Sequence, residues 1–287
     1  KNGLWYKIQH KIADKLVFSK WRAAVGGKLV CIASGGAALN PKLERIFLCA
    51  NIVCLQGYGL TETCVVVSVN RYGEDNIRIG TCGPVIAGVD VKIAEEDGEI
   101  LVKGPNVMMG YYKNPEATAE VIDNEGWFHT GDVGTFVEGR FLKITDRKKE
   151  IFKTSSGKYI APLMIENRIK ESRFVEQSMV VGENQKFASA VIVPSFANFK
   201  EYAREHNIAW TTNEEMSQHE ELKRIINDHI KTINKSLAPF EQLKRVAILS
   251  KEWSIEGGEL TPKMSLKRKV IKEKNMEAIN KIFSVED

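Results

Sequence analysis

The chain has 287 residues, of which 43% are hydrophobic and 27% are charged, and this balance is typical of about two globular domains. The net charge of +4 is modest, and the basic run at 267–274 is typical of the solvated face of a helix, so we expect no nucleic-acid partner. No apolar stretch approaches the roughly 18 residues of a membrane span, which predicts no transmembrane segment.

Strand and helix patterns alternate at the start of the chain. In order, they predict a helix, a strand, a helix and a strand at residues 7–25, 28–34, 41–48 and 52–56. Such alternation predicts an α/β fold with a parallel sheet, and ligands bind such sheets at the carboxyl ends of the strands. Two glycine-rich turns, 34–38 and 57–63, lie at those ends.

The second turn, GYGLTET, is the most informative stretch of the sequence. Its glycines let the backbone turn sharply and approach a ligand. Tyr58, Thr61 and Glu62 then offer a ring to stack on a base, a hydroxyl for a phosphate and a carboxylate for Mg²⁺. Alone, this turn could equally be an ordinary connection between a strand and a helix.

The pattern changes after about residue 78. Short strands separated by turn residues are predicted at 89–93, 99–103 and 140–144. A charged break at 146–150 marks a domain boundary. Beyond it, an α+β pattern has helices at 162–171, 195–206, 214–236 and 265–283, and strands at 175–182, 187–193 and 243–249. We therefore expect a first domain at 1–145, with an α/β part at about 1–78 and a β-rich subdomain at about 79–145, and a second domain at 146–287.

The five cysteines all lie among the first 82 residues and form no C-x-x-C pair. An odd number cannot all be paired, and three lie in apolar runs, where buried thiols are common. We therefore expect a reducing, cytoplasmic compartment, with no disulfide framework and no zinc site.

Several motifs follow one another in a fixed order. They are SGGAAL at 34–39, GYGLTET at 57–63, GWFHTGD at 126–132, DRKKEIFK at 146–153, GKYIAP at 157–162 and LTPKMSLKR at 260–268. Together they closely resemble the motifs of the AMP-forming acyl-CoA synthetases of the adenylate-forming superfamily. Within that superfamily, the residues of the motifs are most similar to those of the long-chain fatty-acid–CoA ligases. The resemblance covers essentially the whole chain. It implies the C-terminal part of a large adenylation domain, followed by a small α+β domain.

The resemblance implies a two-step reaction. ATP and a fatty acid form an acyl adenylate and pyrophosphate, and the thiol of coenzyme A then displaces AMP. The first step concentrates negative charge at the α-phosphate, so it needs Mg²⁺ and positive donors. For the second step the small domain of this family swings about a hinge. A fatty-acid substrate would also suit peripheral membrane association.

The same resemblance implies roles for individual residues of the first domain. The implied nucleotide-binding residues are Gly36, Ala37 and Ala38 at the adenine edge, Gly57 and Tyr58 with the Tyr58 ring stacked on adenine, Thr61 at the α-phosphate and Asp132 at the ribose. Glu62 is the implied ligand of Mg²⁺. The alternatives are that Tyr58 is a packed core aromatic and that Asp132 caps a turn, and we interpret His129 as structural.

For the second domain, the resemblance implies that Arg147 assists at the ribose. Lys149 falls at the hinge position, and Lys153 matches a lysine of the thioester-forming face. The alternative for both lysines is that they merely solvate a charged loop.

Two departures from the family pattern stand out. The glycine-rich phosphate loop is absent from this sequence, which predicts a C-terminal fragment that does not catalyse adenylation alone. The family's C-terminal catalytic lysine also falls on Ser265, with Lys263 and Lys267 two residues away on either side. A serine cannot supply a cation, so either a neighbouring lysine, Lys267 or Lys263, acts in its place or the adenylation step is impaired. Of the two lysines, we expect Lys267 to take the role.

Two other functions remain open. A fatty acyl-AMP ligase or acyl-carrier-protein ligase would share the nucleotide motifs. The two departures would also suit a non-catalytic nucleotide-binding module. The sequence does not fix the preferred acyl chain length.

Overall fold

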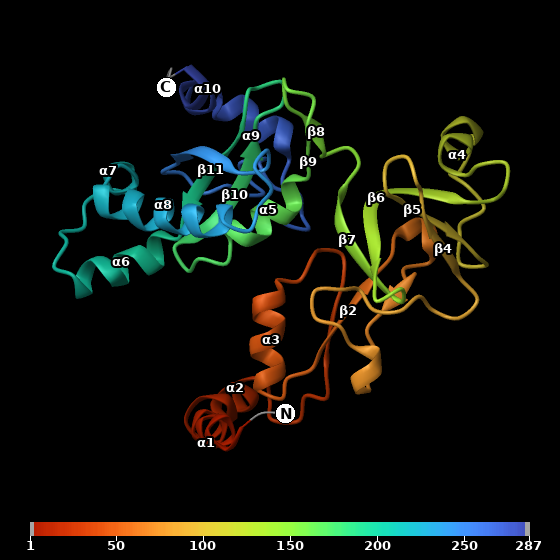
Figure 1. The fold of residues 1–287 in the computed structure, drawn as a ribbon, viewed down its shortest axis with the longest axis horizontal. Coiled ribbons are helices and arrows are strands. Elements are labelled where there is room, and N and C mark those ends of the chain that lie inside the picture. The colour runs from red at the N-terminus through yellow and green to blue at the C-terminus, as the bar shows by residue number, and fades with distance from the viewer. Residues whose placement is uncertain (1–2, 285–287) are drawn as a thin grey trace. The chain divides into compact units, whose positions relative to one another are not determined.

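The computed structural model describes residues 3–284, apart from the side chain of Glu74. The chain divides into two compact units, Lys1–Ile144 and Thr145–Asp287 (Figure 1). Both units contain helices packed with strands, so the predicted α/β class is confirmed. No helix among residues 3–284 is long and apolar enough to cross a membrane. All five cysteines lie in the described part of the chain and are free thiols.

The first unit begins with a continuous helical segment. It comprises α1 (Leu4–Ala13), a π-helical turn (Asp14–Phe18) and α2 (Ser19–Ala24). Gly26 and Gly27 end it in left-handed conformations, at φ +89° and +71°, which glycine adopts without a steric penalty.

A small sheet follows, in the order β1 (Ile32–Ser34), β2 (Cys54–Tyr58) and β3 (Ser68–Val69). α3 (Pro41–Cys49) connects the parallel strands β1 and β2, with Asn40 capping its first turn. The strand predicted at 28–34 is longer than the observed β1, which begins only at Ile32. The strand predicted at 52–56 ends two residues too early, because β2 continues to Tyr58. β3 explains the second difference, because it pairs with Gly57 and Tyr58 and keeps them extended.

The β-rich part of the first unit is a four-stranded sheet. Its strands lie in the order β4 (Asp90–Ile93), β5 (Glu99–Lys103), β6 (Phe128–Val137) and β7 (Phe141–Arg147). β6 was not predicted, because polar residues interrupt its hydrophobic pattern. The sequence also gave no sign of α4 (Pro115–Val121) or of a short 3₁₀ turn at Glu74–Asn76.

The second unit is built on a sheet in the order β10 (Val175–Val181), β11 (Ala188–Pro194) and β12 (Leu243–Ile248). The central strand β11 is antiparallel to β10 and parallel to β12, and it is buried along its whole length. Its alternate side chains serve two cores, because successive residues of a strand point to opposite faces. Ala190 and Ile192 join one core, and Val191 and Val193 join the other.

Helices pack on both faces of this sheet. The core of Ala190 and Ile192 includes residues of α5 (Pro162–Ile169), α6 (Phe196–Glu205), α7 (Asn213–Ser217) and α8 (Glu220–Asn234). The other core includes residues of α9 (Arg268–Lys274) and α10 (Met276–Ser284). A short hairpin of β8 (Phe152–Lys153) and β9 (Tyr159–Ile160) precedes α5.

Two predicted helices are each divided in two. The helix predicted at 214–236 breaks before His219, whose ring Nδ1 accepts the amide of Glu221, 3.2 Å away, and so caps α8. The helix predicted at 265–283 begins only at Arg268 and breaks at Asn275. The turn before it places Met264 at φ +61°, which is incompatible with a helix.

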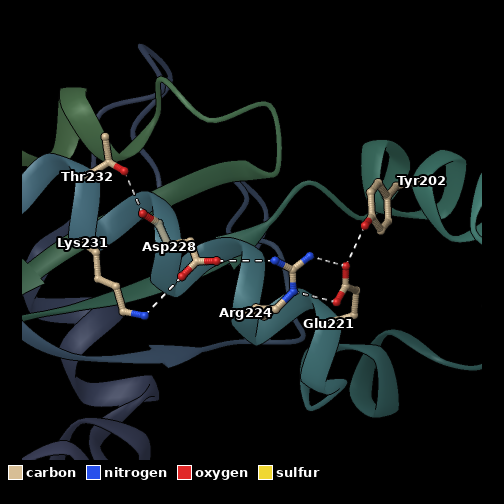
Figure 2. A network of polar contacts seen from close by, with 6 residues as sticks. All are labelled: Tyr202, Glu221, Arg224, Asp228, Lys231 and Thr232. Atoms are coloured by element: carbon tan, nitrogen blue, oxygen red, sulfur yellow. Dashed lines mark hydrogen bonds and ion pairs between the residues drawn. The ribbon is translucent and has the colours of Figure 1, made fainter.

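A polar network covers the exposed side of α8 (Figure 2). Arg224 donates to both carboxylate oxygens of Glu221, at 2.7 and 2.9 Å, and Tyr202 of α6 donates to the same carboxylate at 2.6 Å. Asp228 extends the network through Arg224 at 3.5 Å and Lys231 at 3.2 Å, and Thr232 donates to the Asp228 carbonyl. These contacts join α6 to α8 at the edge of the core.

We expect this network to stabilise the second unit only while Glu221 is ionised. Hydrogen bonds from Arg224 and then Tyr202 lower the Glu221 pKa to about 2. Because the folded pKa lies below the unfolded one, the stabilisation is present above about pH 4.5 and is lost as the pH falls toward 2. The Glu221→Gln variant should therefore have a lower Tm than the wild type at pH 7, and this difference should shrink at pH 3.

The neighbouring Glu220→Gln variant is the control, because Glu220 is highly exposed and its one ion pair among the described residues is with Lys223. Its effect on Tm should be small at both pH values. An undiminished difference between wild type and Glu221→Gln at pH 3 would contradict the prediction.

Candidate functional site

The two glycine-rich turns lie side by side at the carboxyl ends of β1 and β2. Ser34 pairs with Gln56 in parallel register, and a Cβ added to Gly35 would lie 3.6 Å from the Gly57 carbonyl oxygen. Residues 35–38 are exposed, and Gly36 is at φ +78°. The predicted adenine edge is thus open backbone, with side chains no larger than methyl groups.

The turn after β2 is tightly folded on itself. A Cβ on Gly59 would lie 1.7 Å from the Val65 carbonyl oxygen, so only glycine fits there. A 3₁₀ turn (Thr61–Thr63) follows, and Cys64 and Val65 are left-handed at φ +46° and +77°. A β-branched residue in that region costs about 1–3 kcal/mol, and such strain gathers at functional sites.

This turn presents Thr61 and Glu62 at the surface. Thr61 is exposed and Glu62 is half-buried. Tyr111 donates to Glu62 Oε1 at 3.0 Å, and the Met108 amide donates to the Glu62 carbonyl at 2.8 Å. Among the described residues, nothing bonds Glu62 Oε2. Tyr111 was not among the residues predicted from the sequence, although it follows Gly110 and forms an aromatic pair with Tyr112 in the sequence, which could have drawn attention to it.

Glu62 is suited to Mg²⁺. Its half-buried carboxylate is oriented by Tyr111 through one oxygen and offers the other. Mg²⁺ in nucleotide sites is held by one or two carboxylates together with phosphate oxygens and waters, so a single carboxylate fits this chemistry.

Tyr58 does not present its ring to solvent. The side chain is 7% exposed and packs in a core with Val67, Cys82 and Leu142. Its hydroxyl donates to Asp132 Oδ2 at 2.8 Å. Burial and then the charge of Asp132 raise the Tyr58 pKa, so the phenol stays protonated and keeps donating.

Asp132 lies within β6 and is 5% exposed. Its amide donates to Thr130 Oγ1 at 3.1 Å, and the Gly131 amide donates to Glu99 Oε1 at 2.8 Å. His129 is 3.2 Å from the other Glu99 oxygen. The buried Glu99 of β5 therefore shapes the backbone that presents Asp132. Sequence reasoning missed this residue, although a carboxylate opening an apolar strand is a recognisable signal.

The predicted hinge lies in residues 146–150, called the hinge segment below, which follow Thr145 at the start of the second unit and include the end of β7. Asp146 is fully buried and accepts the amide of Arg147 at 2.7 Å and that of Leu163, at the start of α5, at 2.9 Å. Burial raises the Asp146 pKa to about 6, against the opposing effect of these amides. Arg147 and Lys149 are exposed.

Lys153 lies on the β8–β9 hairpin. It is exposed, and its ammonium nitrogen is 5.4 Å from the centre of the Tyr159 ring. Lys153 and Tyr159 are opposite each other in the antiparallel register of the hairpin.

The loop predicted to carry the catalytic lysine, residues 260–267, is called the catalytic loop below. It is a tight turn closed by a bridge between Leu260 and Leu266. The Thr261 amide donates to the Ser265 carbonyl at 2.9 Å, and the Ser265 amide donates to Thr261 Oγ1 at 3.1 Å. Lys263, Ser265 and Lys267 are all exposed. Both candidate lysines therefore remain available to a ligand.

Arg268 corrects the expectation of a solvated basic run. Its side chain is only 22% exposed and forms ion pairs with Glu166 and Glu150. The neighbouring Lys269 is exposed, as predicted for the run. The partners of Arg268 lie more than 100 residues earlier in the chain, so the local charge pattern gave no sign of them.

Comparison with known families matches both units. Residues 5–112 match the family described as "AMP-binding enzyme", and residues 149–287 match "AMP-binding enzyme C-terminal domain". A long-chain-fatty-acid–CoA ligase of Mycobacterium bovis is 36% identical over 99% of this chain and 47% of its own length. Long-chain-fatty-acid–CoA ligase 1 of Homo sapiens is 35% identical over 99% of this chain and 41% of its own. The chain thus spans about half the length of the curated relatives it matches.

Solved structures agree on the fold. The adenylation domain of a carboxylate reductase from Mycobacterium chelonae aligns with a TM-score of 0.74 at 25% identity, covering 96% of this chain and 42% of that one. A carboxylic acid reductase didomain from Segniliparus rugosus, solved with AMP, aligns with a TM-score of 0.73 at 24% identity, covering 98% and 40%. With both units matched and the relatives aligned along almost all of the sequence, the chain belongs to the AMP-binding enzymes, the adenylate-forming family that includes the long-chain fatty-acid–CoA ligases.

Proposed function

We propose that this chain is the nucleotide-binding and C-terminal part of an AMP-forming long-chain fatty-acid–CoA ligase. The observation that carries the proposal is the alignment of such ligases along 99% of the chain at 35–36% identity. The geometry supports it, because the carboxyl ends of β1 and β2 bring an open glycine edge beside Gly57, at the start of the turn that carries Thr61 and Glu62. The substrates would be ATP, a long-chain fatty acid and coenzyme A.

In the first unit, we assign Asp132 to the ribose hydroxyls, since a carboxylate can accept two hydrogen bonds from a diol. Gly36, Ala37 and Ala38 would line the adenine edge. The buried Tyr58 ring favours a packed aromatic over one stacked on adenine, and its hydroxyl gives it a different role. By donating to one oxygen of Asp132, Tyr58 would hold that carboxylate in place for the ribose.

The turn after β2 would serve the phosphates. Thr61 has an exposed hydroxyl that can donate to an α-phosphate oxygen. Glu62, oriented by Tyr111, would hold Mg²⁺, which when bound neutralises phosphate charge. The rigid turn keeps both side chains in place before the nucleotide arrives, so little ordering is left for the reaction itself.

The second unit would supply cations. Arg147 and Lys153 are exposed and can reach a ligand, and Lys149 lies at the proposed hinge. In the catalytic loop, we assign Lys267 to the charge that develops at the α-phosphate, in place of the lysine that the family carries at the position of Ser265.

The test compares this 287-residue chain with the full-length protein, using ATP, a long-chain fatty acid and either coenzyme A or an acyl carrier protein. We expect the full-length protein to release pyrophosphate and form the coenzyme A thioester. The 287-residue chain alone should form no adenylate, because its sequence has no glycine-rich phosphate loop.

Two outcomes would overturn the proposal. Transfer to the carrier protein and not to coenzyme A would identify a carrier-protein ligase. Calorimetric binding of AMP by a full-length protein that releases no pyrophosphate would identify a non-catalytic nucleotide-binding module. Adenylate formation by the 287-residue chain would contradict only the prediction that this chain is inactive alone.

A further inference from the structure

A largely buried ion-pair cluster begins at Arg268, the residue that follows the catalytic loop. Arg268, the first residue of α9, donates from Nη1 and Nη2 to the two carboxylate oxygens of Glu166, at 2.7 and 2.8 Å. Its Nε donates to Glu150 at 3.0 Å. All three side-chain nitrogens of Arg268 are thus bonded to carboxylates.

Glu166 is itself firmly held. It lies on α5 and is 2% exposed, and Oε1 also accepts the amide of Val180 in β10 at 2.7 Å. Two parallel bonds between a guanidinium and a carboxylate fix both distance and orientation. Arg268 is therefore attached to the helix and sheet core of the second unit, rather than to a mobile surface chain.

This attachment sits one residue from Lys267 and three from Ser265. On the other side of the loop, the Lys267 amide donates to the Glu259 carbonyl at 2.8 Å, and Glu259 pairs with Lys274 at 2.7 Å. The tip of the loop, residues 262–265, is exposed, and the hydrogen bonds described above for it are internal to the loop. The position of Lys267 therefore depends on Arg268 more than on the tip of the turn.

We propose that Arg268 is a positioning residue for adenylate formation, holding the catalytic loop in fixed register with α5 and with the hinge segment through Glu166 and Glu150. The proposal rests on the proposed function, in which a cation of this loop stabilises charge at the α-phosphate. Arg268 touches no substrate in this role and acts through the placement of Lys267. Glu150 lies next to Lys149, so its bond to Arg268 links the loop to the hinge segment.

A buried ion pair is weak support for stability in general, because removing two charges from water is costly. An apolar pair of similar volume would serve stability as well. An apolar pair cannot provide the two parallel hydrogen bonds by which the guanidinium and the carboxylate fix each other's position. Position matters here, because a displacement of about 1 Å at a catalytic group can lower a rate by about 100-fold. Arg268 is therefore explained better by the placement of the loop than by the stability of the core.

The test uses the Arg268→Lys variant of the full-length protein. Lysine keeps the positive charge beside Glu166 but cannot form the two parallel hydrogen bonds to its carboxylate. Two half-reactions are measured separately: pyrophosphate exchange, and thioester formation from a synthetic acyl adenylate and coenzyme A. We expect exchange to fall by about tenfold or more in kcat, with thioester formation within about twofold of wild type. Lys272→Met is the matched control, since Lys272 also lies on α9 but, in the part of the chain that the structure describes, pairs only with the exposed Glu183.

A double variant, Glu166→Gln with Arg268→Gln, carries the test if Arg268→Lys does not fold. It removes the charges of both partners together and should show the same separation of the half-reactions. Equal loss in both half-reactions, or no loss in either, would overturn the positioning role. Absence of pyrophosphate exchange in the wild-type full-length protein would instead overturn the proposed function on which this role rests.

Discussion

Replacing Tyr58 with phenylalanine in the full-length protein is expected to raise the KM for ATP by about 10- to 100-fold. The variant keeps the ring and loses only the hydroxyl that donates to Asp132 Oδ2 at 2.8 Å. A hydrogen bond to a charged group contributes about 1.5–3 kcal/mol, and here it orients a carboxylate that is 5% exposed. Without it, the Asp132 carboxylate loses one of the contacts that orient it toward the ribose.

Ribose selectivity separates this role from a general loss of structure. Wild-type protein should prefer ATP to 2′-deoxy-ATP and 3′-deoxy-ATP, and the Tyr58→Phe variant should lose most of that preference while still choosing adenine over other bases. Tyr111→Phe is the matched control. It also removes a bond from a phenol to a carboxylate, but at Glu62, so it should leave the ribose preference unchanged.

Tyr58→Leu distinguishes the two roles of this residue. If Tyr58 stacks on adenine, as the resemblance to the family implies, Tyr58→Phe should behave like wild type and Tyr58→Leu should lose affinity for every adenine nucleotide. If Tyr58 holds Asp132, both variants should lose the ribose preference. Wild-type selectivity in Tyr58→Phe would contradict the role proposed here.

The parts of the fold that depend on local pattern were predictable. β5 was predicted at its observed bounds, because a Gly-containing turn precedes a short apolar run. The two glycine-rich turns were placed together correctly, since parallel strands bring their carboxyl ends to one edge. β6 was missed, because its polar residues are held extended by pairing with β5 and β7, which no local period records.

The features of the candidate site that the sequence did not predict are contacts between residues far apart in the chain. Tyr58 and Asp132 are 74 residues apart, and Arg268 and Glu166 are 102 apart. The sequence indicates which side chains can bind a nucleotide, but burial decides which of them can reach it. The buried ring of Tyr58 and the ion pairs of Arg268 therefore emerged only from the packing.

The choice between Lys263 and Lys267 can be argued from the loop. Ser265 and Lys267 flank Leu266, which pairs with Leu260 in an extended bridge. Alternate residues of an extended segment point to the same side, so Lys267 shares the side of Ser265. Lys263 is separated from Ser265 by Met264 at φ +61°, which interrupts that alternation. The geometry therefore favours Lys267 as the cation that stands in for the missing lysine.

In the full-length protein, Lys267→Ala should slow pyrophosphate exchange by about 100-fold, the usual loss when one donor to a developing charge is removed. Adding Ser265→Lys to that variant should restore most of the rate, because it returns a cation to the family's position. Thioester formation from a synthetic acyl adenylate should change little in either protein, since that half-reaction needs no charge at the pyrophosphate-forming centre.

Lys263→Ala is the control for charge on the loop, because it removes one cation at the same sequence distance from Ser265 on the other side. Its exchange rate should stay within about threefold of wild type, the scale of a surface charge. A large loss in Lys263→Ala and none in Lys267→Ala would reverse the assignment. If neither alanine variant slows exchange while Ser265→Lys alone accelerates it, no native lysine has taken over the role, and the serine itself is what limits adenylate formation in this protein.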